Sequence, residues 1–208
     1  MTAGDGDVAP PVAERWNSNL HAFEVLLREV PPDARRGLDV GCGEGETARR
    51  LRRRVPSVVG LDPDPSCIEA ARAVGDDIEY RLGSLEDADL EAAVFDVVTA
   101  VAVLHHLDHD DGLARLGALV RPGGRLLVVG LARSRSPRDL ARDAFDVVAL
   151  RRHTWSREVW ETPAPKCWPP PVTHTDVRRR SPVVLPGARV RRLPSFRYGL
   201  TWRRAPEA

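Results

Sequence analysis

The sequence predicts an α/β fold in which a doubly wound, mostly parallel sheet is covered by helices on both faces. From residue 36 onward, strand signals and helix signals alternate along the chain, which is typical of such sheets. Several strand signals are continuous apolar runs, such as FDVVTAVAV over 95–103, and runs of this kind suit strands buried on both faces. A glycine-rich segment, LDVGCGEG over 38–45, joins the first of these strands to the next helix.

The alternation gives each element approximate bounds. We expect strands at Gly37–Val40, Ser57–Leu61, Ile78–Leu82, Phe95–Val101 and Arg125–Leu131, and helices near Glu46–Arg54, Pro65–Val74, Asp87–Ala92 and Asp110–Val120. A helix over 12–30 precedes them, ended by the PPD segment at 31–33, and residues 1–11 are expected to form a flexible tail.

The amino-acid composition of the chain changes after Leu131. Residues 133–176 contain the proline-rich segment TPAPKCWPPPV, which suits neither a helix nor a central strand. We interpret 133–176 as an insertion, and 189–204 as two closing antiparallel strands, Arg189–Leu193 and Phe196–Arg203. The chain therefore reads as one domain over 1–208, with 36–131 as its ligand-binding core.

The glycine loop points to a ligand whose charge is partly positive. Glycines 41, 43 and 45 lie between a strand and a helix, where the backbone approaches a ligand closely. The spacing departs from the dinucleotide fingerprint, because Glu46 stands where its third glycine belongs. Glu46 and Asp39 would repel a pyrophosphate and favour an amino group or a sulfonium.

A second acid follows at the end of the next strand. Asp62 closes SVVGLD, a place where an acidic residue typically binds ribose hydroxyls, and Pro63 can lie against a base. Each feature alone is also compatible with an ordinary turn, but their order on the expected elements favours a nucleoside ligand. Cys42, inside the loop, is interpreted as a small filler rather than a nucleophile.

These motifs resemble those of the class I S-adenosylmethionine (SAM)-dependent methyltransferases. The resemblance covers about residues 36–131 and is carried by LDVGCGEG, VVGLDPDPSCIEAAR, RLGSLED, FDVVTAVAVLHHL and RPGGRLLVV. It implies a Rossmann-like, seven-stranded sheet of order 3-2-1-4-5-7-6 with the last strand antiparallel. It further implies S-adenosyl-L-methionine as cofactor, bound by Asp39, Gly41, Cys42, Gly43, Gly45, Asp62, Pro63, Ser84, Leu85 and Val101. Many relatives have an Asp after the glycine at position 83, whereas this chain has Ser84.

Three histidines follow the fourth expected strand, in VLHHLDHDD. His105 and His106 are expected near the cofactor, since ligands bind at the carboxyl ends of strands in open sheets. Either is a candidate general base for a substrate hydroxyl or amine, and the alternative is packing or hydrogen bonding to the cofactor. The spacing matches no zinc pattern, so we predict no metal. His109, among aspartates, is expected to be solvated.

Two other regions contribute candidate substrate contacts. Trp16, Asn17 and His21 lie on the first expected helix, which is either a packed cap or a lid over the cofactor. Trp155 lies in the insertion, where aromatic side chains could form a wall for a flat small molecule or simply pack.

The composition of the chain narrows its possible partners and location further. Thirty-one basic residues balance 30 acidic ones, for a net charge of +1, which argues against bulk nucleic-acid binding. The arginines at 49–54 are interpreted as the solvent-exposed face of a helix whose buried face is formed by Ala48, Leu51 and Val55. No apolar run reaches membrane-spanning length. Three cysteines without a CxxC, after a start unlike a secretion signal, favour a cytoplasmic location.

We therefore predict a SAM-dependent methyltransferase, a monomer or homodimer, acting on an oxygen or nitrogen nucleophile of a small molecule. Direct displacement needs little beyond alignment of the reactants, so a missing catalytic triad does not count against activity. The alternatives are an RNA or protein methyltransferase and a non-catalytic SAM-binding protein. A nicotinamide enzyme is disfavoured by Asp39 and Glu46.

Overall fold

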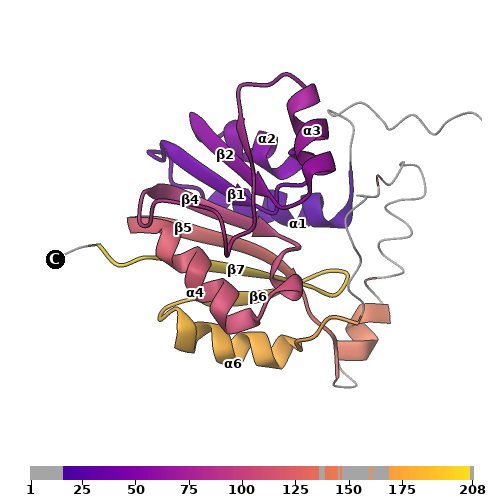
Figure 1. Ribbon diagram of the computed structural model, residues 1–208. Helices are drawn as coiled ribbons and strands as arrows, with labels where there is room; N and C mark the ends of the chain where they lie inside the picture. Colours follow the sequence, from indigo (N-terminus) through magenta and orange to yellow (C-terminus); the bar gives the residue numbers. More distant parts are fainter. Residues whose placement is uncertain (1–15, 136–138, 145, 147–159, 161–168, 207–208) are drawn as a thin grey trace, which may run out of the picture.

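A seven-stranded sheet of order β3-β2-β1-β4-β5-β7-β6 forms the centre of the molecule (Figure 1). The computed structural model describes residues 16–135, 139–144, 146, 160 and 169–206. Strands β1 to β5 are parallel, and β7 runs antiparallel to β5 and β6, which confirms the predicted order and orientation. The strands are β1 (Arg36–Val40), β2 (Ser57–Asp62), β3 (Glu79–Leu82), β4 (Phe95–Val101), β5 (Val120–Leu131), β6 (Arg189–Leu193) and β7 (Arg197–Arg203).

The apolar runs of the sequence occupy the middle of this sheet, as their composition requires. All seven residues of β4 are buried, because helices cover both of its faces. Strand β5 begins at Val120, earlier than the expected Arg125. The RPGG segment forms an irregularity between two pairings with β4, Val120 with Phe95 and Arg125 with Val97, and Gly124 packs directly against the Asp96 carbonyl, where no side chain fits.

Helices cover the two faces separately (Figure 1). Residues of α1 and α2 pack with Val97, Leu127 and Val129 in one apolar cluster, whereas α4 and α6 pack on the opposite face with Val98, Leu126 and Val128 in another. The α-helices are α1 (Ser18–Leu26), α2 (Glu46–Arg52), α3 (Pro65–Ala73), α4 (His109–Leu119) and α6 (His174–Val184), with short 3-10 helices η2 (Leu27–Glu29) and η3 (Leu104–His106).

Two of the sequence-based expectations about helices are wrong. Residues 87–92 form turns rather than a helix, although the segment contains good helix formers: Ser84 and Asp87 hydrogen-bond each other locally, and six residues are too few for a stable helix without tertiary packing. Helix α6 was not predicted, because it contains Pro182 and an arginine run. Its signal was the capping box, in which Thr173 and Asp176 satisfy each other's backbone N–H groups.

The arginines of α2 are largely neutralised within the protein. Ala48, Leu51 and Val55 are buried as expected, and the arginines around them form ion pairs with acids of neighbouring elements. These pairs are Arg49 with Glu46 and Asp76, Arg50 with Glu24, and Arg52 with Asp77. The face predicted to be solvated is therefore only partly exposed, since the side chains of Arg49 and Arg50 are 12% and 18% exposed.

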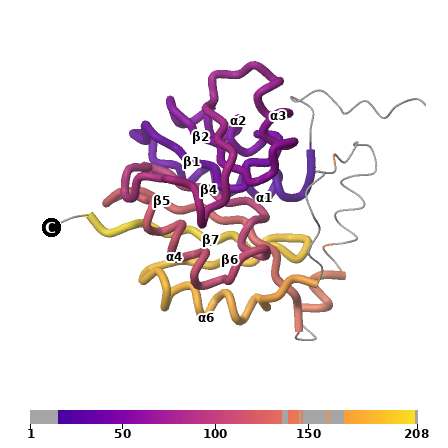
Figure 2. The backbone as a smooth tube through the Cα atoms, viewed as in Figure 1, coloured from indigo at the N-terminus to yellow at the C-terminus, as the bar shows by residue number. Residues whose placement is uncertain are grey.

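The insertion leaves and returns to the sheet at one place (Figure 2). The Arg133 N–H donates to the Val172 carbonyl at 3.0 Å, so the two ends of the excursion lie side by side. Arg192 of β6 then fixes the first residues of the excursion through ion pairs with Asp139 and Asp143. The expected tail at 1–11, the first residues of the 12–30 helix and most of 133–176, including Trp155, lie outside the described residues.

Candidate functional site

A cavity of about 420 Å³ opens at the carboxyl ends of β1, β2 and β4, within the size range of small-molecule sites. From β1 the chain adds β2 and β3 on one side of the sheet and then β4 and β5 on the other side. The cavity lies at this change of direction, the usual ligand position in open α/β sheets. Among the residues expected from the sequence, it is lined by Asn17, Gly41, Cys42, Gly43, Asp62, Pro63, Ser84, Leu85, Val101 and His106.

The glycine loop forms the floor of this cavity. All three glycines have positive φ, between 53° and 87°, which explains the residue type. At Gly43 a Cβ atom would meet open space, so the loop backbone faces the cavity directly. At Gly41 a Cβ atom would collide with Val103, which follows β4 and also lines the cavity. Gly45 packs against Tyr80 rather than against the cavity, so its role is to shape the loop.

Asp39 lies beneath the loop rather than on the cavity wall. Its side chain is fully buried, and its oxygens accept hydrogen bonds from the hydroxyls of Thr47 and Thr99, the latter at 2.7 Å. Burial raises the pKa of Asp39 to about 6, against the lowering effect of the two threonine hydrogen bonds. Thr47, which also lines the cavity, was missed from the sequence; its signal is a hydroxyl in the first turn of the helix that follows the glycine loop.

Asp62 ends β2 with its carboxylate at the cavity. One oxygen accepts from the Gly43 N–H at 2.8 Å and the other from the Asp64 N–H at 2.9 Å. Each oxygen keeps a second lone pair for a ligand hydroxyl. Pro63 and Leu85 line the cavity beside it, and the Ser84 hydroxyl bonds Asp87 at 2.9 Å. The cavity thus has one acidic and one largely apolar side.

Cys42 is a filler of this site. The side chain is buried between the two acids, and burial raises the pKa of its thiol, with Asp39 and Asp62 adding to the effect. The thiol therefore stays protonated at neutral pH, as the interpretation from the sequence required.

The three histidines take different positions. His106 is exposed and lines the cavity, and its ring lies 4.1 Å from the ring of His105. His105 is buried beneath it, and burial, followed by the charges of His106 and Arg197, lowers the pKa of His105 to about 4. His109 is not solvated as expected: it is buried between α4 and α6, with Nε2 at 3.3 Å from the Ser181 hydroxyl.

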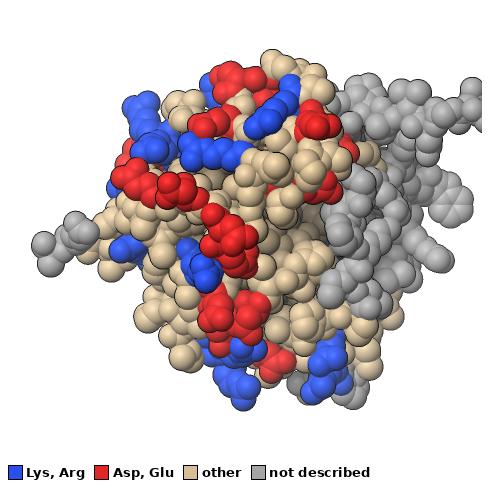
Figure 3. Space-filling model, in the orientation of Figure 1, with Lys and Arg blue, Asp and Glu red and all other residues tan. Residues whose placement is uncertain are grey.

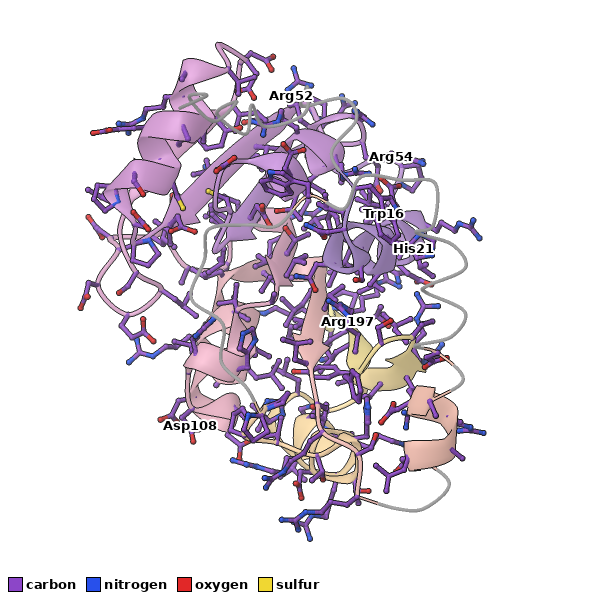
Figure 4. The ribbon with its side chains drawn as sticks, turned by 90° about the vertical axis from the view of Figure 1, so that its right-hand side faces the viewer. Trp16, His21, Arg52, Arg54, Asp108 and Arg197 are labelled. Carbon is purple, nitrogen blue, oxygen red and sulfur yellow. The ribbon has the colours of Figure 1, made fainter. Side chains whose placement is uncertain are left out.

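Helix α1 and the insertion meet at the open side of the cavity. Asn17 caps α1 through its side-chain oxygen, and Asn17, Asn19 and Leu20 line the cavity. The expected contacts Trp16 and His21 do not line it: Trp16 precedes α1 rather than lying on it as expected, and its ring centroid is 6.2 Å from that of His21 on α1 (Figure 4). Trp160 lines the cavity instead, and its backbone N–H donates to the Trp16 backbone carbonyl at 2.9 Å.

Two features of the described residues bear on other classes of site. No group of three or more His, Cys, Asp or Glu side chains there is arranged to hold a metal ion. None of the helices described has the length and hydropathy to cross a bilayer.

The sheet order, the glycine loop and the acid after β2 together define the class I SAM-dependent methyltransferase architecture. A family model described as a methyltransferase domain matches residues 38–128. An uncharacterised methyltransferase of Mycobacterium tuberculosis is 39% identical over 191 residues, covering 90% of this chain and 96% of that protein. The chain belongs to this methyltransferase family, whose cofactor is S-adenosyl-L-methionine.

More distant relatives share parts of the chain or the fold alone. A ubiquinone biosynthesis O-methyltransferase of Methylocella silvestris is 42% identical over 109 residues, covering 50% of this chain and 43% of that protein. A SAM-dependent methyltransferase from Aquifex aeolicus superimposes with a TM-score of 0.59 at 16% identity, over 86% of this chain and 88% of that chain.

The cavity fits SAM in its chemistry. The open backbone at Gly43 accommodates a ligand without a side-chain clash, and Asp62 presents acceptor lone pairs suited to ribose hydroxyls. The buried negative charge of Asp39 favours the cationic amino acid part of the cofactor.

The pKa of Asp39 predicts how SAM binding depends on pH. The folded-state pKa of about 6 lies above the usual 3.8, so protonated Asp39 stabilises the fold at low pH, and this contribution is lost as pH rises through 6. A cationic ligand favours the ionised form. SAM affinity should therefore fall as pH is lowered from 7.5 to 5, by up to about tenfold per pH unit below 6. Calorimetry on Asp39→Asn should show weaker binding at pH 7.5 and a flatter profile; an unaltered profile would remove Asp39 from the linkage.

Substitution of Asp62 should weaken the cofactor site without unfolding the protein. Asp62→Asn removes a charged acceptor, so the free energy of SAM binding should become less favourable by about 1–3 kcal/mol. Asp64→Asn is the matched control, since Asp64 also lines the cavity but caps α3 through Ser66. Calorimetry measures both affinities. If Asp62→Asn binds SAM like the wild type, Asp62 does not contact the cofactor.

Proposed function

We propose that the protein transfers a methyl group from SAM to an oxygen or nitrogen nucleophile of a small molecule. The observation that carries this proposal is that one cavity joins the glycine loop and Asp62 to an exposed histidine, His106, and to Trp160. Such a cavity has a cofactor side and an acceptor side. The partial relatives named as ubiquinone biosynthesis O-methyltransferases support a small-molecule hydroxyl as acceptor.

The residues of the cofactor side bind and orient the donor. Gly41 and Gly43 let the backbone approach the amino acid part, Asp62 accepts the ribose hydroxyls, and Pro63 and Leu85 bracket the base. SAM supplies an electrophilic methyl group on a sulfonium. What the chain must provide is alignment of the acceptor with that methyl group and exclusion of water, which together lower the barrier strongly.

His106 is the better placed of the two candidate bases. It lines the cavity, whereas His105 lies beneath it and is largely desolvated. The pKa of about 4 also makes His105 a weak proton acceptor at neutral pH. We therefore assign proton removal from an acceptor hydroxyl or ammonium to His106, and a supporting position under its ring to His105.

The surface near the cavity favours a small molecule over a nucleic acid. On the face in Figure 3, acidic side chains form a band between basic ones, and α4 begins on this face with Asp110 and Asp111. A basic cleft formed by Arg125, Arg189, Arg191 and Arg203 does exist among the described residues. It lies around the amino end of β5, at the opposite end of the strand from the cofactor cavity.

The direct test uses SAM with a labelled methyl group. The protein is incubated with it and, separately, with small-molecule, RNA and protein fractions of the source cell. Label in the small-molecule fraction is the expected result. Label in RNA or protein would overturn the acceptor class and keep the chemistry, and SAM binding without transfer to any fraction would support a non-catalytic role.

His106→Ala should separate catalysis from binding once an acceptor is in hand. Loss of a general base lowers kcat by about 10²–10⁴-fold, while SAM affinity should stay within a factor of about three. The matched control is His105→Ala, which removes the neighbouring ring and should lower kcat less and the unfolding midpoint more, because His105 is buried. Equal losses of kcat and SAM affinity in His106→Ala would contradict the role as base.

A further inference from the structure

Arg197 occupies an unusual position beside the acceptor side of the cavity. It begins β7, immediately after the β6–β7 turn, and lies below Trp16 and His21 in the view of Figure 4. Its Nε donates to the Asn19 side-chain oxygen at 2.7 Å, and its Nη1 donates to the Ser195 carbonyl at 2.6 Å. Asn19 lines the cofactor cavity, so Arg197 stands directly behind one of its walls.

The guanidinium has no carboxylate partner in the described part of the chain, although Arg197 is partly buried. Burial alone lowers the pKa of Arg197 to about 10, so the side chain stays charged at neutral pH. Two other partly buried arginines each pair with two acids: Arg49 with Glu46 and Asp76, and Arg192 with Asp139 and Asp143. A partly buried charge that neutral groups alone satisfy is costly, and a bound anion would offset that cost.

The turn before Arg197 has an unfavourable backbone conformation. Ser195 and Phe196 both have positive φ, 61° and 62°, which non-glycine residues adopt rarely and which accumulates at functional sites. The Ala132 N–H donates to the Phe196 carbonyl at 2.9 Å and fixes the turn to the end of β5. The backbone is thereby committed to presenting Arg197 at this edge of the sheet.

A purely structural role does not require the charge. Arg191 of β6 also connects the closing hairpin to α1, through the Val25 carbonyl, and does so from the exposed surface. Arg197 uses Nε and Nη1 for its two neutral partners, and Nη2 has no hydrogen-bond partner among the described residues. A guanidinium edge of this kind binds carboxylates and phosphates through charge-assisted hydrogen bonds.

We propose that Arg197 binds an oxyanion group, a carboxylate or a phosphate, of the methyl acceptor, and that the enzyme is therefore specific for anionic acceptors. This inference rests on the proposed methyl transfer. Arg197 does not itself line the cavity around the glycine loop, so the anion belongs to the second substrate rather than to the carboxylate of SAM. The charge of Arg197 also contributes to the lowered pKa of His105.

The test measures anion binding in the protein saturated with S-adenosylhomocysteine. Benzoate, inorganic phosphate and the neutral isostere benzamide are titrated separately, and the Arg197 Nε–H resonance is followed by nitrogen-15 NMR. We expect a saturable shift with benzoate or phosphate and none with benzamide, and the responding anion identifies the oxyanion class. Arg197→Gln should weaken anion binding by at least about tenfold, Arg197→Lys by less, and the control Arg191→Gln should bind like the wild type.

Each contrary result has a separate meaning. Equal shifts with benzamide and benzoate, or unchanged benzoate binding in a folded Arg197→Gln protein, would overturn the proposal. A tenfold loss of S-adenosylhomocysteine affinity in Arg197→Gln would overturn it as well, since the anion would then be the cofactor's own carboxylate. Failure of the wild type to bind S-adenosylhomocysteine would instead defeat the proposed function.

Discussion

A carboxylate without access to water joins the elements on which the site depends. Asp39 at the end of β1 accepts hydrogen bonds from Thr47 of α2 and Thr99 of β4, so one buried side chain connects two strands and the helix after the glycine loop. Burying this charge opposes folding, as its raised pKa records. The loop above it needs positive φ at three glycines. Both features are unfavourable in the isolated protein, and both become favourable toward a cationic ligand that approaches the loop backbone.

Residues from distant parts of the chain form the cavity walls above the glycine loop. Helix α1 supplies Asn17, Asn19 and Leu20, and the excursion after β5 supplies Trp160. The backbone bond from Trp160 to Trp16 shows that these two contributions depend on each other. The excursion is closed at its base by the pairing of Arg133 with residues 172–173 and held by Arg192, so its ends are fixed to the sheet whatever its middle contacts.

The sequence predicts those parts of the protein whose physical cause is local. Apolar runs identify the central strands, alternation identifies the two closing strands, and the order of loop, Asp62 and RPGG identifies the family architecture and most of the cavity wall. Parts that depend on tertiary contacts were not predictable in this way. Asp39 was expected at the ligand, but two threonines distant from each other in sequence enclose it. His109 looked solvated because aspartates flank it, yet α6, a helix concealed by Pro182, covers it. Arg197 is one of many arginines in the sequence, and only its burial without an acid distinguishes it.

The charges of the site change sign from one side to the other. Asp39 and Asp62 make the cofactor side negative, and Arg197 adds a positive charge behind the part of the wall that Asn19 forms. A cationic donor and an anionic acceptor entering from opposite sides would each meet the charge that favours it and be disfavoured at the other's position. The same arrangement keeps His105 neutral, since burial and Arg197 both oppose its protonation. His106, whose ring is tilted against the neutral ring of His105, lines the cavity and is then the histidine that remains accessible to a proton leaving the acceptor.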